Sequence, residues 1–423
     1  MANEFSKEER VAFEEILEGF QDQLVLSRNV SIYRTNDQMM ERTGNVIWRP
    51  QPYIMQSFDG TDQTANFGEQ TQLSVPATLG FSKSVPWIMT ASELRDALQE
   101  KRLGDSAKQK LASDINRAIL DVASLQGTLV IKQAAAATGF VDVALCEAIM
   151  NEQGIVDYDR YLALSTRDYN GMAADLAARQ YMPGKPTTAY ERAYVGRIAS
   201  FDTFKLDYAV RLASQGAAAL VINTLAGGGN VYVPQATQVA ATGERSNVDN
   251  RFQQVTIAGI QAAGVRAGDA FTIATVDAVH HITKQDTGQL KTFRIISIDG
   301  ADTATICPPL ITGQGGTDAE LQYQNCVVNT AAANSLLVFL NTVAAAANPF
   351  WQKDALEILP GRYAVPTDAG ASVMRATTDN GIELVMQKQY DINTMTTKYR
   401  LDTLFGVVNK QPEMSGIILF GQT

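Results

Sequence analysis

Two histidines and two aspartates are the side chains of this 423-residue chain whose types and spacing could hold a metal ion. His280 and His281 are the only histidines, and they are adjacent. Adjacent residues of a strand point to opposite faces, so these imidazoles cannot bind one ion together, and we interpret both as polar surface or turn residues. Asp157 and Asp159 would share one strand face and could bind a cation or act as a carboxylate pair. Polar residues at the start of a strand are the simpler interpretation.

Motifs of the common enzyme classes are missing from the sequence. There is no HExxH run, and Gly184-Lys185 is followed by Pro186 without the glycine-led loop of a Walker A motif. The run that begins at Gly370 lacks the second glycine of a nucleophile elbow. The glycines at 227–229 precede a predicted strand rather than a helix, so a flexible linker is a better interpretation than a phosphate loop.

Cys146, Cys307 and Cys326 are odd in number, far apart and without CxxC spacing. This pattern argues against a disulfide framework and against structural zinc, and favours reduced thiols in the core. Together with the missing motifs, it predicts a protein that is not an enzyme and that holds neither a metal nor a cofactor.

Length and composition predict a soluble protein of more than one packed unit. A single core rarely grows beyond roughly 250–300 residues. The longest apolar run, 216–225, is far shorter than the ~20 residues that span a bilayer, and no signal peptide is visible, so we expect folding in the cytoplasm and no membrane partner. The net charge of −10 disfavours direct DNA binding, because phosphate contacts need Lys and Arg.

The N-terminal half alternates predicted helices with extended segments. Residues 6–27 form an amphipathic helix with a capping box at Ser6 and Glu9. Residues 53–85 are polar without a sustained period, which predicts a long, poorly buried hairpin. A second capping box, Thr90 with Glu93, opens a helix that we expect Gly104 to end, before a structural helix over 105–126. The remaining elements predicted before position 223 are a strand at 128–131, a helix at 140–152, a strand at 161–164 and a helix at 167–179.

Short strands dominate the chain from about residue 224 onward. Glycines and turn sequences separate them, which predicts a separate β-barrel or sandwich. Helical alternation is expected at 334–347, and strands at 372–375, 382–387 and 415–419. The fold class is therefore α+β, because helices and strands intermix without a regular βαβ repeat. The strands predicted inside the β unit lie at 231–233, 252–257, 270–276, 292–298, 303–306 and 326–328.

Three stretches resemble the major capsid proteins of tailed bacteriophages, of the short-tailed type with an inserted β-barrel. They are 348–355 (NPFWQKDA), 390–393 with 400–407 (YDIN and RLDTLFGV), and 247–252 followed by Gly268-Asp269 (NVDNRF and GD). The resemblance implies the Hong Kong 97-like capsid fold. It assigns an N-terminal arm to 1–35, a peripheral domain to 36–137 with an extended loop at 53–85 and a spine helix at 105–126, an axial domain to 138–223, a β-barrel insertion to 224–344, and a return through the axial and peripheral domains to 345–423.

The same resemblance implies the function and the partners. It predicts a coat protein that self-assembles through pentamers and hexamers, with a scaffolding protein and a portal protein, into an icosahedral head around double-stranded DNA. The protein would belong to the virion after assembly in the host cytoplasm, and its acidic charge would suit a wall that encloses DNA without binding it. A carbohydrate- or surface-binding β-domain protein and an enzyme with an unrecognised site are the alternatives.

Two groups of charged residues are candidate contact sites. Glu14, Glu15 and Glu18 add negative charge to the N-terminal helix and are expected to dock a basic scaffold, or else form a solvated face. The loop at 240–252 has too little apolar content to pack down, so we expect a contact between neighbouring capsomers or, alternatively, a solvated hairpin tip. Its charges are Glu244, Arg245, Asp249 and Arg251, and the order of the first two differs from the pattern expected of the subgroup.

Overall fold

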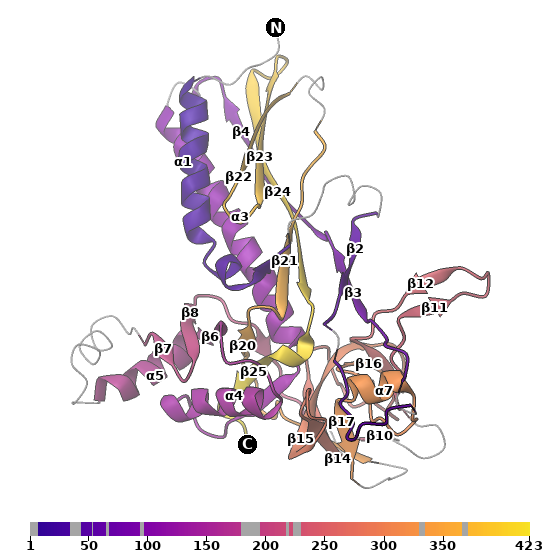
Figure 1. Ribbon diagram of the computed structural model, residues 1–423. Helices are drawn as coiled ribbons and strands as arrows, with labels where there is room; N and C mark the ends of the chain where they lie inside the picture. Colours follow the sequence, from indigo (N-terminus) through magenta and orange to yellow (C-terminus); the bar gives the residue numbers. More distant parts are fainter. Residues whose placement is uncertain are drawn as a thin grey trace. The chain divides into compact units, whose positions relative to one another are not determined.

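The computed structural model describes residues 7–33, 44–52, 54–64, 67–93, 97–178, 195–216, 220–222, 230–329, 335–365 and 371–423. The chain divides into two compact units (Figure 1). Unit 1 comprises Met1–Ile47, Ala77–Ile119 and Leu356–Val408, and unit 2 comprises Trp48–Pro76, Leu120–Ala355 and Asn409–Thr423. Helices and strands intermix in both, which confirms the α+β class. Within the described residues, no helix combines the length and apolar composition needed to cross a membrane.

Unit 1 is built on a six-stranded sheet of order β1-β21-β24-β23-β22, with β4 paired to β24. Aromatic pairs reinforce the β4–β24 ladder: Phe81 stacks on Phe405 with ring centroids 5.3 Å apart, and Trp87 on Tyr399 at 5.6 Å. Such cross-strand pairs stabilise a sheet beyond its backbone bonds. The strands are β1 (Ser31–Ile32), β4 (Phe81–Thr90), β21 (Leu356–Pro360), β22 (Ser372–Thr377), β23 (Glu383–Asp391) and β24 (Thr396–Asn409).

Helix α1 (Lys7–Gln23) buries the predicted apolar stripe, with Phe13, Ile16 and Phe20 no more than 5% exposed. The predicted helix break at Gly104 is wrong, because α3 (Ala97–Gln126) is one continuous helix of 30 residues. An added Cβ at Gly104 would lie 2.6 Å from Ile16 Cδ1, so the glycine permits a close approach of α1 instead of ending α3. Ser6, which was predicted to cap α1, lies outside the described residues.

Unit 2 contains a six-stranded sheet of order β5-β25-β20-β6-β8-β7. Its helices are α4 (Phe140–Glu152) and α5 (Thr166–Ala178), which confirm the predictions at 140–152 and 167–179. Gly416 of β25 lies beside Leu129 of the parallel neighbour β5, and a Cβ there would be 2.2 Å from the carbonyl oxygen of Leu129. The strands are β5 (Leu129–Lys132), β6 (Arg160–Ser165), β7 (Arg197–Ile198), β8 (Phe201–Leu206), β20 (Asn348–Gln352) and β25 (Ser415–Leu419).

A second, seven-stranded sheet of unit 2 has the order β10-β18-β14-β15-β16-β13, with β17 paired to β14. It has its own core, centred on Phe271, Phe293 and Ile295. Five of the six predicted strands are confirmed, but residues 231–233 form no strand. The strands are β10 (Val221–Ile222), β13 (Gln253–Thr256), β14 (Ala270–Val279), β15 (Asp286–Ile298), β16 (Thr303–Cys307), β17 (Cys326–Val328) and β18 (Ser335–Phe339).

The prediction of a helix at 334–347 is also wrong for residues 335–347, which the structure describes. Residues 335–339 form β18, in which Leu337 and Phe339 are buried while Leu336 and Val338 are exposed. Pairing with β14 on one side and β10 on the other stabilises the strand, so long-range partners override the local helical pattern.

The expected extended loop begins at the ladder of β2 (Val46–Pro50) and β3 (Ser74–Thr78). Met55, Phe58 and Phe67 between these strands are more than half exposed, which agrees with a poorly buried segment. The prediction is wrong for the end of the stretch 53–85, because β3 and β4 occupy most of residues 74–85 and bury Val75 and Ala77. The part of the loop that leads back to β3 is hydrogen-bonded to helix α7 (Asp318–Tyr323), because the Tyr323 hydroxyl donates to the Thr71 carbonyl at 2.8 Å.

Candidate assembly contacts and the buried polar junction

The acidic face of α1 lies opposite its buried apolar stripe. Glu14, Glu15 and Glu18 are all exposed, so the structure brings the three predicted residues together on one solvent-facing surface. Glu9, one of the other acids of the helix, instead contacts Lys388 of β23, and the Tyr399 hydroxyl lies 3.4 Å from the same carboxylate. The apolar stripe and this ion pair fix the face that α1 turns to solvent.

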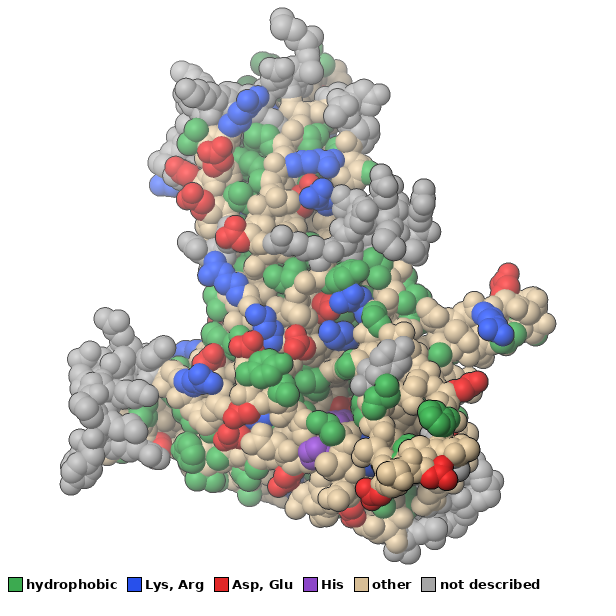
Figure 2. Space-filling model, viewed as in Figure 1, with side chains coloured by type: hydrophobic (Ala, Val, Ile, Leu, Met, Phe, Trp, Pro, Cys, Tyr) green, Lys and Arg blue, Asp and Glu red, His purple; other side chains and the backbone are tan. Residues whose placement is uncertain are grey.

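The predicted charged loop forms a β-hairpin of β11 (Thr237–Val239) and β12 (Arg245–Asn247), which projects from the seven-stranded sheet (Figure 1). The Ala240 amide donates to the Glu244 carbonyl at 2.9 Å and closes the turn. Side chains of both charge signs lie on the hairpin (Figure 2). Glu244 and Arg245 are exposed, and neither side chain has a hydrogen-bond or ion-pair partner among the described residues.

Asp249 and Arg251 occupy a different place, at the base of the hairpin. The Arg251 guanidinium donates to Asp249 through Nε at 2.9 Å and through Nη2 at 2.7 Å, and its Nη1 donates to the Asn409 carbonyl at 2.7 Å. Arg251 is only 9% exposed and lies over the Phe252 ring at 4.8 Å. These two charges are therefore paired within the chain, unlike the two at the tip.

The remaining candidates for chemistry are structural residues. His280 is a turn residue as predicted, since its Nδ1 accepts from the amides of Ile282 and Thr283 at 3.3 and 3.1 Å. Asp157 pairs with Arg160 at 3.5 Å. No group of three or more His, Cys, Asp or Glu side chains in the described part of the chain is placed to hold a metal ion. The three cysteines are buried free thiols as predicted, and burial raises the pKa of Cys326 to about 12.

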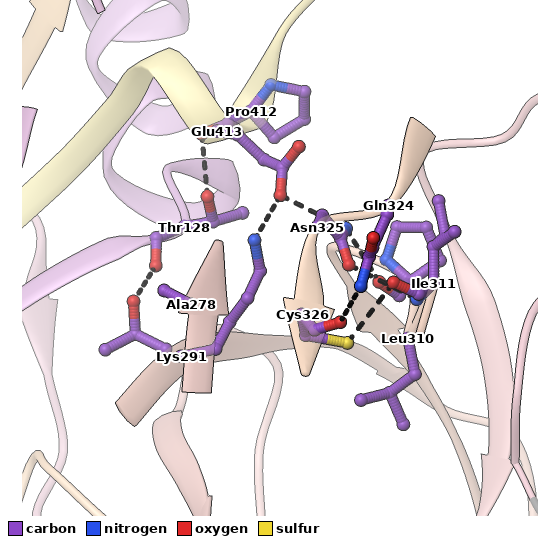
Figure 3. A network of polar contacts seen from close by, with 12 residues as sticks. Thr128, Ala278, Lys291, Leu310, Ile311, Gln324, Asn325, Cys326, Pro412 and Glu413 are labelled. Atoms are coloured by element: carbon purple, nitrogen blue, oxygen red, sulfur yellow. Dashed lines mark hydrogen bonds and ion pairs between the residues drawn. The ribbon is translucent and has the colours of Figure 1, made fainter. Parts of the chain in front are cut away.

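Sequence reasoning missed a buried polar junction of unit 2 (Figure 3). Strand β15 supplies three side chains to it. Lys291 pairs with Glu413 of the 3-10 helix η3 (Pro412–Met414), and the Thr292 hydroxyl donates to the Thr128 carbonyl at 2.5 Å. Arg294, which is fully buried, donates to the Ser124 carbonyl at 2.6 Å, at the end of α3.

Asn325 of the segment before β17 completes the junction. Its amide nitrogen donates to Glu413 Oε1 at 3.2 Å and to the Pro309 carbonyl at 3.0 Å, while its oxygen accepts from the Ile311 amide at 3.2 Å. The only sequence signal was the alternation of polar and apolar residues at 292–295, next to Lys291. That alternation cannot reveal a partner 122 positions away in the chain.

The electrostatics of the junction depend on burial. Burial raises the pKa of Glu413, but Lys291, His281 and Lys284 more than offset this, so the pKa ends below its usual value. Burial lowers the pKa of His281 to about 4 and that of Lys284 to about 8. His281 lies in a turn, as predicted, and is partly exposed, but its Nε2 is buried, and with this lowered pKa its imidazole is neutral at neutral pH.

Comparison with known proteins places the chain in a family. A family model described as "P22 coat protein - gene protein 5" matches residues 1–421. The solved structure of Mycobacterium phage Che8 is 8% identical, with 92% of this chain and 88% of that chain covered and a TM-score of 0.43. The capsid structure of cyanophage P-SCSP1u is 10% identical over 92% and 85%, with a TM-score of 0.42. The CUS-3 coat protein I-domain is 29% identical over 29% of this chain and 96% of that chain, with a TM-score of 0.21. Because the family match extends over nearly every residue, the chain belongs to the P22 coat protein family and is a major capsid protein of the tailed-phage type, as its motifs predicted.

Proposed function

We propose that this coat protein assembles through pentamers and hexamers, with the help of a scaffolding protein, into an icosahedral head that contains a portal and encloses double-stranded DNA. The head would form in the host cytoplasm and become the virion capsid. The observation that carries this proposal is the projecting hairpin, whose exposed Glu244 and Arg245 have no partner among the described residues. The net charge of −10 supports enclosure of DNA without adhesion to it.

The hairpin is suited to a contact between neighbouring capsomers. A two-fold contact is self-complementary, so Glu244 of one subunit can meet Arg245 of another and the reverse. Each exposed pair contributes only roughly 0–1 kcal/mol, but the contact repeats around the shell. Asp249 and Arg251 take part by holding the base of the hairpin, since their charges are already paired.

Charge reversal tests this contact. We expect Glu244→Arg and Arg245→Glu, each alone, to yield misassembled or heat-labile shells in electron micrographs of assembly reactions with scaffold. The double reversal should partly restore closed heads, because it recreates the opposite charges. Normal heads of unchanged heat stability from both single variants would show that the hairpin is not an inter-capsomer contact.

The acidic face of α1 is proposed as the docking site of a basic segment of the scaffold. Replacing Glu14, Glu15 and Glu18 by Gln should slow scaffold-dependent assembly, and the defect should shrink as salt screens the wild-type attraction. Glu152→Gln, an exposed acid on α4, is the control and should assemble as the wild type does. Equal assembly rates of the triple variant and the control at low salt would contradict the proposal.

A further inference from the structure

Unit 2 contains a half-open cavity of about 290 Å³ beside the polar junction. Its walls are largely apolar and include the extended-loop segment, the stretch that follows β16, and η3, together with residues after α4, at the base of the hairpin, in the turn after β14 and between α7 and β17. Prolines have a fixed φ, so walls rich in them keep their form without a ligand. The volume lies close to the lower limit of small-molecule sites, roughly 300 Å³. The principal wall residues are Pro52, Leu73, Pro308, Pro309, Ile311 and Pro412.

The polar groups that line the cavity are mostly engaged by the protein itself. Asn325 and Arg251 use their side-chain groups in the contacts described above. Glu413 is different, because Lys291 and Asn325 both contact its Oε1 and no described residue contacts Oε2. The His281 imidazole also lines the cavity, and its buried Nε2 has no hydrogen-bond partner among the described residues.

The charge balance at the junction selects against a charged ligand. Lys291 already neutralises Glu413, and Lys284 and His281 lie near the same carboxylate. The His281 imidazole is neutral at neutral pH, so a cation would meet the positive charge of Lys284, and an anion placed at Oε2 would meet the carboxylate oxygen of Glu413. A neutral hydroxyl can donate to that oxygen without adding charge.

We propose that this cavity is a binding site for a small uncharged aromatic alcohol, with the ring between the proline and aliphatic walls and the hydroxyl on Glu413 Oε2. Such a ligand would touch the extended-loop segment, the stretch after β16 and η3 at once. Binding would therefore hold these parts of unit 2 together and raise the melting temperature. The proposal does not depend on the assembly function.

Three naphthalene derivatives of similar size test the chemistry on the purified full-length protein by titration calorimetry. We expect 2-naphthol to bind saturably with a stoichiometry of one. Its methyl ether, which lacks the donor, and 2-naphthoate, which is charged, should each bind at least fivefold more weakly. Equal affinities for the three compounds, or no saturable binding of 2-naphthol, would overturn the proposal.

Variants locate the site. Ile282 lines the cavity and is 67% exposed, so Ile282→Trp should narrow the mouth without disturbing the core. Val338→Trp adds the same side chain at an exposed position outside the cavity and is the matched control. We expect at least a fivefold loss of 2-naphthol affinity in the first variant and none in the second. Unchanged affinity in Ile282→Trp, or an equal loss in both variants, would place the binding elsewhere and refute the assignment.

Discussion

Acid should weaken unit 2 through His281. Its pKa in the folded protein is about 4, against 6.5 for the ordinary side chain. As the pH falls below 6.5, His281 of the unfolded chain therefore becomes protonated, whereas His281 of the folded chain stays neutral. The free energy of unfolding decreases until about pH 4. Each unit of this pKa difference corresponds to about 1.36 kcal/mol. His281 alone therefore lowers the free energy of unfolding by about 3 kcal/mol over the whole pH range. The lowered pKa of Glu413 acts in the same direction, because that stability is lost as the carboxylate is protonated.

The perturbation is His281→Gln, which keeps a polar side chain but does not titrate. Urea unfolding of the wild type and the variant should be followed between pH 7.5 and 5 by the fluorescence of tryptophan, since Trp351 is fully buried in unit 2. Between pH 6.5 and 5 the wild type should lose about 2 kcal/mol more than the variant. His280→Asn, at the other histidine, is the control and should retain the wild-type slope. If wild type and His281→Gln lose stability in parallel, the imidazole is not held neutral by burial and the reasoning fails.

Two further changes test the packing and the polar junction. Gly416→Ala should destabilise the protein by about 3 kcal/mol or more in urea unfolding, because the new Cβ would press on the Leu129 carbonyl, which lies in a strand and cannot rotate away. Gly80→Ala, where nothing lies within 4 Å, should instead be neutral or stabilising by roughly 0.4–1 kcal/mol, and equal effects would contradict the packing argument. Arg294→Met should cost about 3 kcal/mol because it leaves the buried Ser124 carbonyl unpaired, and a variant as stable as the wild type in the same assay would show that this buried charge is dispensable.

Much of the fold follows from local sequence patterns. The helical spacing of Phe13, Ile16 and Phe20 predicted the buried face of α1, and the acidic residues between them then had to face solvent. The bounds of α4 and most strands of the seven-stranded sheet were predicted because turn residues and alternation are local signals. Gly104 failed as a helix stop because glycine lowers helix stability by only about 1 kcal/mol, which neighbouring turns and a packed partner helix can offset.

By itself the sequence determined the α+β class, the absence of familiar catalytic motifs, the runs that resemble tailed-phage coat proteins and the charges at 244–251. Only the tertiary structure decided how those charges divide, with Asp249 and Arg251 paired at the base and Glu244 and Arg245 left at the tip. It also decided that β18 is a strand and that Lys291 meets Glu413. The physical reason is the same in each case, because pairing, burial and pKa depend on atoms brought close by folding, and the partners lie far apart along the chain.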